Sequence, residues 1–255
     1  MKTLDDLCAD PDYFMITAHR GASFEFPENT LLSMRRAVEA GADMIEFDLR
    51  GSADQVPVLL HDETIDRTSN GSGRPEEHTL AELKSYNFSY FLQGVRRETP
   101  AYSDVTIPTF EEVLAEFRDL AAMNIQIYTK DDLVLAEICR LFKKYDMYGR
   151  GYFMITGEYV EKIRRIDSRI ELCVARGWET RSNFEILRQA KADNCRFTQP
   201  IREYSSSETY RYIRELGMRS NVFFCDDPAQ MIELRNSGAQ GILTNKAHLM
   251  CRQRH

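Results

Sequence analysis

The stretch that decides the fold spans residues 44–61. It holds two apolar runs separated by a short polar break: Met44-Ile45-Glu46-Phe47-Asp48-Leu49-Arg50, then Val56-Pro57-Val58-Leu59-Leu60-His61. Each run has the length and composition of a β-strand. The break is too short for a crossover helix, so we expect an antiparallel hairpin with its turn at Asp54-Gln55.

This hairpin predicts which side chains meet. With the turn at that position, Asp48 lies opposite His61, and opposed residues project from the same face. Glu46 and Arg50 share that face through the two-residue period of a strand. A slip of one residue would turn His61 to the other face. The expected register therefore brings two carboxylates, a histidine and an arginine together.

Outward from this hairpin, apolar runs alternate with helical patterns along the whole chain. We predict strands at 14–18, 44–48, 56–61, 124–128, 152–156, 170–175, 196–199, 221–225 and 241–244. We predict helices at 30–40, 111–120, 133–145, 158–166, 184–190, 208–216 and 229–237. Such alternation favours an α/β protein, either a parallel barrel or an open doubly wound sheet. No glycine-rich nucleotide motif follows a strand, which weakens the second alternative.

Composition narrows the class of protein. The 255 residues are 43% hydrophobic and 29% charged, which is ordinary for a globular chain. A formal charge of −7 argues against a nucleic-acid partner, and no apolar run reaches membrane-spanning length. Six cysteines without a Cys-x-x-Cys pair favour a reducing cytoplasm. We expect one cytoplasmic domain over residues 1–255, with its oligomeric state left open.

Residues 62–108 interrupt the alternation. They contain the turn-rich loop Thr68-Ser69-Asn70-Gly71-Ser72-Gly73, one short helix at 80–86 and an aromatic, polar stretch up to Pro108. Loops that follow the strands of a parallel barrel build its active site. We therefore interpret this segment as an insertion that walls or covers the site.

The polar residues at the strand ends suit a phosphate ester and a metal ion. Glu46 and Asp48 repel each other unless a cation or a proton intervenes, and carboxylate oxygens suit Mg²⁺ or Ca²⁺. The alternative is a solvated strand face, but apolar neighbours make that less favourable. His19 and His61 suit acid–base catalysis, although a lone histidine is more often structural. Arg20 offers a planar fork to phosphate oxygens, or else forms a surface ion pair.

These residues belong to a dense set of motifs over residues 16–73: His19-Arg20-Gly21-Ala22, Pro27-Glu28-Asn29-Thr30, Glu46-x-Asp48, Val56-Pro57-Val58-x-x-His61-Asp62 and Thr64-x-Asp66-Arg67-Thr68-x-Asn70-Gly71-x-Gly73. The set resembles the signature of the glycerophosphodiester phosphodiesterase family. Residues 107–114 and 241–245 continue the likeness. The resemblance implies a TIM (β/α)8 barrel with a small insertion over the C-terminal face of the strands.

The resemblance also implies an activity. The family hydrolyses a small-molecule phosphodiester to sn-glycerol 3-phosphate and an alcohol with a divalent metal, Mg²⁺ or Ca²⁺. By resemblance, His19 and His61 are the acid–base pair, Glu46 and Asp48 are metal ligands, and Arg20 contacts the phosphate. Arg50, on the same face of the hairpin, is a further candidate for substrate binding.

A later strand departs from the family pattern Asn-Ile-Glu-Ile-Lys. Here it reads Asn124-Ile125-Gln126-Ile127-Tyr128-Thr129-Lys130. Gln126 replaces the expected third acidic ligand and can coordinate only through a neutral amide oxygen. Tyr128 replaces the expected lysine, and Lys130 supplies that charge only if the strand extends to it. Asp131 and Asp132 would aid the metal only if their loop folded inward.

Three hypotheses follow. The chain is an active metal-dependent phosphodiesterase, a lyase that stops at a cyclic phosphate, or a binding protein that has lost turnover. Both histidines, with Arg20, Glu46 and Asp48, argue against the third, because a pure binder needs no acid–base pair. We favour the first. Trp178, the only tryptophan, either lines the substrate pocket or is structural.

Overall fold

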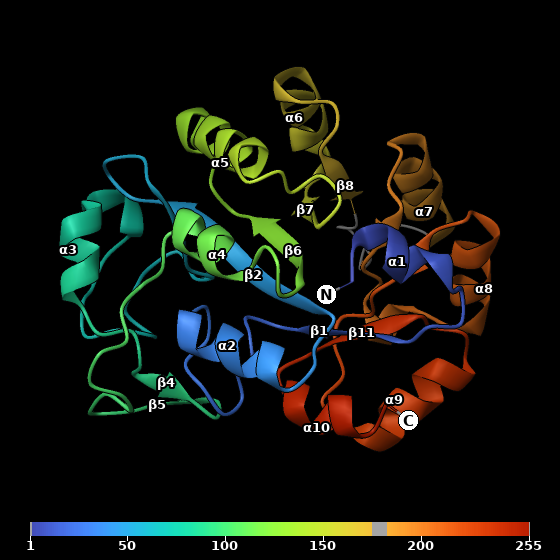
Figure 1. Cartoon of the computed structure of the whole chain (residues 1–255), viewed down its shortest axis with the longest axis horizontal. Helices are drawn as coiled ribbons and strands as arrows, with labels where there is room; N and C mark the ends of the chain where they lie inside the picture. Colours follow the sequence, from blue (N-terminus) through green and yellow to red (C-terminus); the bar gives the residue numbers. More distant parts are fainter. Residues whose placement is uncertain (1, 175–182, 255) are drawn as a thin grey trace.

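The computed structural model describes residues 2–174 and 183–254, and it contains a curled parallel sheet (Figure 1). Strands pair in the order β11-β1-β2-β6-β7-β8, and β9 pairs with β10 beside them. A bridge between Val222 and Ile242 links the β10 segment to β11, so the sheet curls towards closure. The parallel strands are β1 (Met15–Ala18), β2 (Met44–Gly51), β6 (Ala122–Ile127), β7 (Gly151–Ile155), β8 (Glu171–Val174), β9 (Phe197–Thr198), β10 (Arg219–Ser220) and β11 (Gly241–Thr244). The predicted α/β barrel is confirmed.

Helices cover the outer face of this sheet (Figure 1). They are α2 (Leu31–Glu39), α4 (Phe110–Phe117), α5 (Asp132–Lys144), α6 (Val160–Ile166), α7 (Asn183–Ala192), α8 (Ser207–Glu215), α9 (Pro228–Asn236) and α10 (Ala247–Arg252). Thr109 and Glu112 form a capping box at the start of α4, as their spacing predicts. No helix in the described part of the chain is both long and apolar enough to cross a membrane.

A short helix that the sequence did not predict, α1 (Leu4–Ala9), packs against the amino end of the barrel. Leu4 and Leu7 are fully buried, and the Leu4 amide donates to the Gly149 carbonyl just before β7. Arg219, at the start of β10, donates to the carbonyls of Asp10 and Tyr13. Because α1 covers this end, the carboxyl ends of the strands are left for the site.

The hairpin forms with a register one residue away from the predicted one. In the pairing of β2 with β3 (Pro57–Leu59), Arg50 lies opposite Val58, and the Leu60 amide donates to the Asp48 carbonyl. The predicted pairing of Asp48 with His61 is therefore wrong. The turn has three residues rather than two: the Ser52 amide donates to the Val56 carbonyl. Gln55, with φ 63°, takes the left-handed position that closes such turns.

The strand predicted at 221–225 is also displaced, because regular pairing with β9 is confined to Arg219 and Ser220. Pro200 follows β9 two residues after Thr198 and has no N–H to donate. Beyond it only isolated bridges continue, such as Ile201 with Phe223.

The insertion lies beyond the carboxyl end of β2 (Figure 1). It holds the 3₁₀ turn η1 (Pro75–Glu77), helix α3 (Leu80–Ser85) and the unpredicted hairpin of β4 (Phe91–Leu92) with β5 (Val95–Arg96). Its own apolar cluster consists of Val58, Leu60, Ile65, Leu83, Phe88 and Ile107. Because Val58 and Leu60 come from the barrel hairpin, this cluster anchors the insertion to the barrel. The interpretation of residues 1–255 as one domain stays a prediction.

Candidate active site

Both predicted histidines line one cavity of about 500 Å³. His19 directly follows β1, and His61 follows β3. Arg20 lines the same cavity, and Phe91 of the insertion forms part of its wall. The insertion thus contributes to the site, and residues far apart in sequence share one pocket.

His19 is held by uncharged partners. Its Nδ1 lies 2.8 Å from Asn245 Oδ1, while the Asn245 amide nitrogen donates to Asp226. The asparagine oxygen therefore accepts the Nδ1 proton and leaves Nε2 with its lone pair. The ring packs edge-on against Phe223, at 5.4 Å between centroids. Burial, together with the neighbouring charge of Arg20, lowers the pKa of His19 to about 4, so the imidazole is neutral at pH 7.

His61 is held by charged partners. Its Nδ1 lies 2.7 Å from Asp62 Oδ1, and its main-chain carbonyl accepts two hydrogen bonds from the Arg50 guanidinium. Its ring packs edge-on against Tyr128, at 5.3 Å between centroids. The hydrogen bond from His61, reinforced by Arg67, holds the pKa of Asp62 well below its usual range. A carboxylate therefore stands ready to stabilise a protonated imidazole.

Glu46 and Asp48 lie side by side in the interior of the barrel, each 1% exposed. The Arg20 amide donates to Glu46 Oε2 at 2.8 Å, and Arg20 Nε lies 3.2 Å from Asp48 Oδ2, near enough to attract but not aligned as a hydrogen bond. Asn29 donates to the same Asp48 oxygen. Burial and the charge of Asp48 raise the pKa of Glu46 well above its usual range. A further cation would relieve this repulsion.

Gln126 is the third residue of the predicted metal set. It lies opposite Asp48 in the parallel ladder of β2 and β6, and its amide nitrogen donates to the Tyr128 hydroxyl. Within residues 2–174 and 183–254, no three His, Cys, Asp or Glu side chains cluster so as to hold a metal ion. The set is thus two carboxylates and one amide oxygen. These hard oxygen donors fit Mg²⁺ or Ca²⁺, with one charge fewer than three carboxylates would supply.

Other predicted residues lie outside the histidine cavity. Arg50, Tyr128 and Lys130 line a neighbouring cavity of about 270 Å³. Lys130 is exposed because β6 ends at Ile127, so the strand period does not carry it inward. Asp131 and Asp132 do not turn towards the carboxylates: Asp131 caps α5 and Asp132 pairs with Lys162. Trp178 lies outside the described residues.

Several functional candidates had no role assigned from the sequence. They are the polar residues that surround the two histidines: Glu28, Asn29, Asp62, Arg67 and Asn245. Four of them belong to the motifs quoted above, and Asn245 ends the segment 241–245 that continues the likeness. Their spacing in the sequence shows no common period, so only the motifs could have drawn attention to them.

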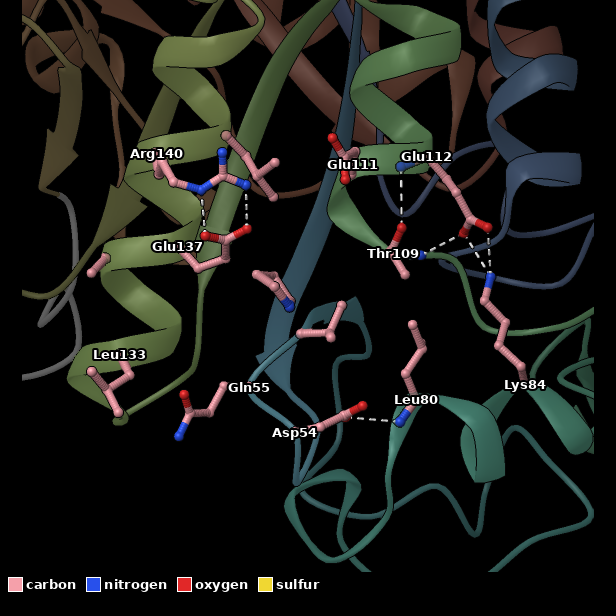
Figure 2. Close-up of a pocket in the computed structure, with 14 residues that line it drawn as sticks. Asp54, Gln55, Leu80, Lys84, Thr109, Glu111, Glu112, Leu133, Glu137 and Arg140 are labelled. Carbon is pink, nitrogen blue, oxygen red and sulfur yellow. Dashed lines mark hydrogen bonds and ion pairs between the residues drawn. The ribbon is translucent and has the colours of Figure 1, made fainter.

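A larger cavity, of about 740 Å³, lies between the β2–β3 turn and helices α3, α4 and α5 (Figure 2). Figure 2 shows two ion pairs in its wall: Lys84 pairs with Glu112, and Arg140 pairs with Glu137. Because neither His19 nor His61 lines this cavity and both line the smaller one, the smaller cavity is the candidate active site.

Known proteins resemble this chain along most of its length. The glycerophosphodiester phosphodiesterase of Bacillus subtilis (strain 168) is 29% identical over 249 residues, 92% of this chain and 84% of that protein. Glycerophosphodiester phosphodiesterase 1 of Mus musculus is 31% identical over 156 residues, 60% of this chain and 46% of that protein. An Oleispira antarctica phosphodiesterase, solved in complex with the product sn-glycerol-3-phosphate, superposes with a TM-score of 0.82 at 21% identity, covering 94% of this chain and 96% of that one. The model of the glycerophosphoryl diester phosphodiesterase family matches residues 19–249, which include every site residue described above, and the chain belongs to that family.

Proposed function

We propose that this protein hydrolyses a glycerophosphodiester to sn-glycerol 3-phosphate and an alcohol. The observation that carries the proposal is the pair of histidines in one cavity, each held through Nδ1 but by partners of different charge. A hydrolysis of this kind needs one group to accept a proton and another to donate one. The structural neighbour from Oleispira antarctica binds sn-glycerol-3-phosphate, which agrees with this substrate class.

The partners of the histidines suggest a role for each. His19, whose Nδ1 proton is bound by an amide oxygen, takes the proton from a glycerol hydroxyl as that oxygen attacks phosphorus. His61, whose protonated ring is stabilised by Asp62, gives a proton to the leaving alcohol. The product of this step is a cyclic phosphate. Water then opens the ring, with His61 accepting a proton from the water and His19 returning one to the glycerol oxygen.

Arg20 would bind the phosphate group. It lines the histidine cavity, and its side chain is held in place by Glu28, at 2.9 Å, and by Asp48. The turn that contains it needs Gly21, which has φ 79° and lies so close to Ser33 that a Cβ would clash. This turn also aims the Arg20 amide at Glu46.

We further propose that Glu46, Asp48 and Gln126 hold Mg²⁺ or Ca²⁺. When bound, the cation would offset negative charge on the phosphate oxygens. The raised pKa of Glu46 and the oxygen-only donor set support this assignment. A cytoplasmic location is also proposed, because all six cysteines are free in the structure.

The test is turnover of defined substrates. Purified protein would be mixed with glycerophosphocholine, glycerophosphoethanolamine or other phosphodiesters, with Mg²⁺, Ca²⁺ or a chelator, and the products followed by phosphorus NMR. A phosphomonoester that appears only with metal supports the proposal. A cyclic phosphate that persists indicates a lyase. Binding of substrate without turnover would contradict both enzymatic readings.

A further inference from the structure

A row of alternating charges connects the surroundings of the two histidines. Arg20 bonds to Glu28, Glu28 bonds to Arg67, and Arg67 bonds to Asp62, which holds His61. Glu28 precedes α2, whereas Asp62 and Arg67 lie in the insertion. The proposed reaction gives Glu28 only the role of holding Arg20 and gives Arg67 none, although both line the histidine cavity.

Most of the N–H groups of the Arg67 guanidinium donate hydrogen bonds to other residues of the protein. Its Nη1 and Nη2 donate to the two Glu28 oxygens at 2.7 and 2.8 Å, and its Nε and Nη2 donate to the two Asp62 oxygens at 2.6 and 3.1 Å. Four of the five N–H groups of the guanidinium are thus directed at carboxylates, and little remains for a substrate phosphate. The guanidinium also lies 4.4 Å from the centre of the Phe91 ring.

Glu28 is a buried, ionised partner that fixes the position of the Arg67 guanidinium. Its side chain is only 8% exposed. Burial alone would raise its pKa, but hydrogen bonds and charge from Arg67 and Arg20 outweigh burial and lower the pKa to about 2. Asp62, by contrast, is 31% exposed, and besides His61 the side chain that bonds to it is Arg67.

We propose that Arg67, anchored on Glu28, is a positioning residue that fixes Asp62, so that the Nδ1–H of His61 stays bonded to Asp62 and Nε2 is the nitrogen that exchanges a proton with the substrate. The proposal rests on the function proposed above. It explains why an arginine is needed here: a lysine ammonium cannot bridge two carboxylates with paired, coplanar bonds.

Kinetics of Arg67→Met test the proposal against direct substrate binding. We expect kcat to fall about 100-fold with KM nearly unchanged, as for a catalytic group displaced by about 1 Å. The double variant Arg67→Met/Asp62→Asn should be no worse than the more damaging single variant, because both act through one group. A raised KM with unchanged kcat, or additive effects, would overturn the proposal.

The matched control is Arg35→Met. Arg35 makes the same paired contact with Glu116, but on the surface between α2 and α4. Its kinetics should equal those of the unmodified protein. Should Arg67→Met fail to fold, Arg67→Lys replaces it, and the same separation of kcat from KM is expected.

Nitrogen-15 NMR of the histidine rings tests the positioning without any substrate. In the unmodified protein His61 should show the Nδ1-protonated tautomer, and in Arg67→Met a mixture of tautomers, with His19 unchanged. Identical His61 spectra in the two proteins would refute the proposal. If the unmodified protein turns over no phosphodiester, the proposed function fails, whereas this measurement still decides whether Arg67 positions His61.

Discussion

His19 and His61 are the same residue type in one cavity, yet their surroundings differ in kind. His19 is buried, its ring packs against Phe223, and its Nδ1 bonds to the side-chain amide of Asn245. His61 is about one-third exposed and bonds to a carboxylate held by an arginine. The two rings therefore differ in burial and in the charge of the group that holds Nδ1. The difference predicts that the two histidines do not have interchangeable roles.

The largest expected effect comes from replacing either histidine. His19→Gln and His61→Gln should each lower kcat by about 10²–10⁴-fold on a natural glycerophosphodiester, the usual contribution of an acid or base. A p-nitrophenyl phosphodiester of glycerol separates the two, because its leaving group needs no proton. We expect His61→Gln, but not His19→Gln, to recover most of its activity with this compound. Equal losses on both substrates would show that the comparison is wrong.

The Nδ1 partners should show the same contrast with smaller effects. Asp62→Asn is expected to lower kcat about 10- to 100-fold on the natural substrate and little on the nitrophenyl compound, because it impairs only the acid. Asn245→Ala should lower kcat on both substrates, because His19, the proposed base, loses the hydrogen bond that keeps its proton on Nδ1. Steady-state rates of both variants on both substrates check this. The prediction fails if Asn245→Ala spares the nitrophenyl compound.

Glu28, which is linked to His61 through Arg67 and Asp62, should make the stability of the protein depend on pH. The pKa of Glu28 is about 2 in the folded protein and near 4.5 when unfolded, so the contribution of Glu28 is complete above pH 4.5 and is lost as pH falls towards 2. At pH 7 this corresponds to about 3 kcal/mol. Urea unfolding of the unmodified protein and Glu28→Gln should therefore differ at pH 7, and the difference should shrink as the pH falls towards 2. Glu116→Gln, which alters an exposed ion pair, should change stability by at most about 1 kcal/mol.

The variant Gln126→Glu tests whether the proposed metal site next to His19 includes residue 126. The two carboxylates lie near His19, with Glu46 4.0 Å from its Nε2, whereas the neutral Gln126 bonds to Tyr128, which packs on His61. Restoring a third carboxylate should tighten Mg²⁺ or Ca²⁺ binding by roughly tenfold, because affinity follows ligand charge. Calorimetry with the metal alone measures it. Unchanged affinity would remove Gln126 from the metal site.

Much of the site was predictable because its residues follow apolar runs. His19 ends β1, and Glu46 and Asp48 alternate along β2, so pattern alone places them at one end of a barrel. The register of the hairpin was not predictable, because a two-residue turn and a three-residue turn fit the same polar break. With the observed register, Leu60 takes the place next to Asp48 that was expected for His61.

His61 still lines the cavity, because contacts beyond the end of β3 determine where its ring points. β3 ends at Leu59, and the Arg50 guanidinium holds the His61 carbonyl, so the strand period no longer governs where the ring points. Arg50, expected to bind substrate, lies 8% exposed and is engaged in this contact. The same limit applies to Lys130, which lies past the end of β6.

By itself the sequence determined the barrel, its insertion, the two histidines and the carboxylate pair, because strand and helix periods and local motifs are properties of neighbouring residues. Only the tertiary structure decided which partner holds each histidine. Asn245 lies 226 residues from His19, and Glu28 lies 39 residues from Arg67. Such contacts depend on how the barrel closes and where the insertion packs, and no local period records them.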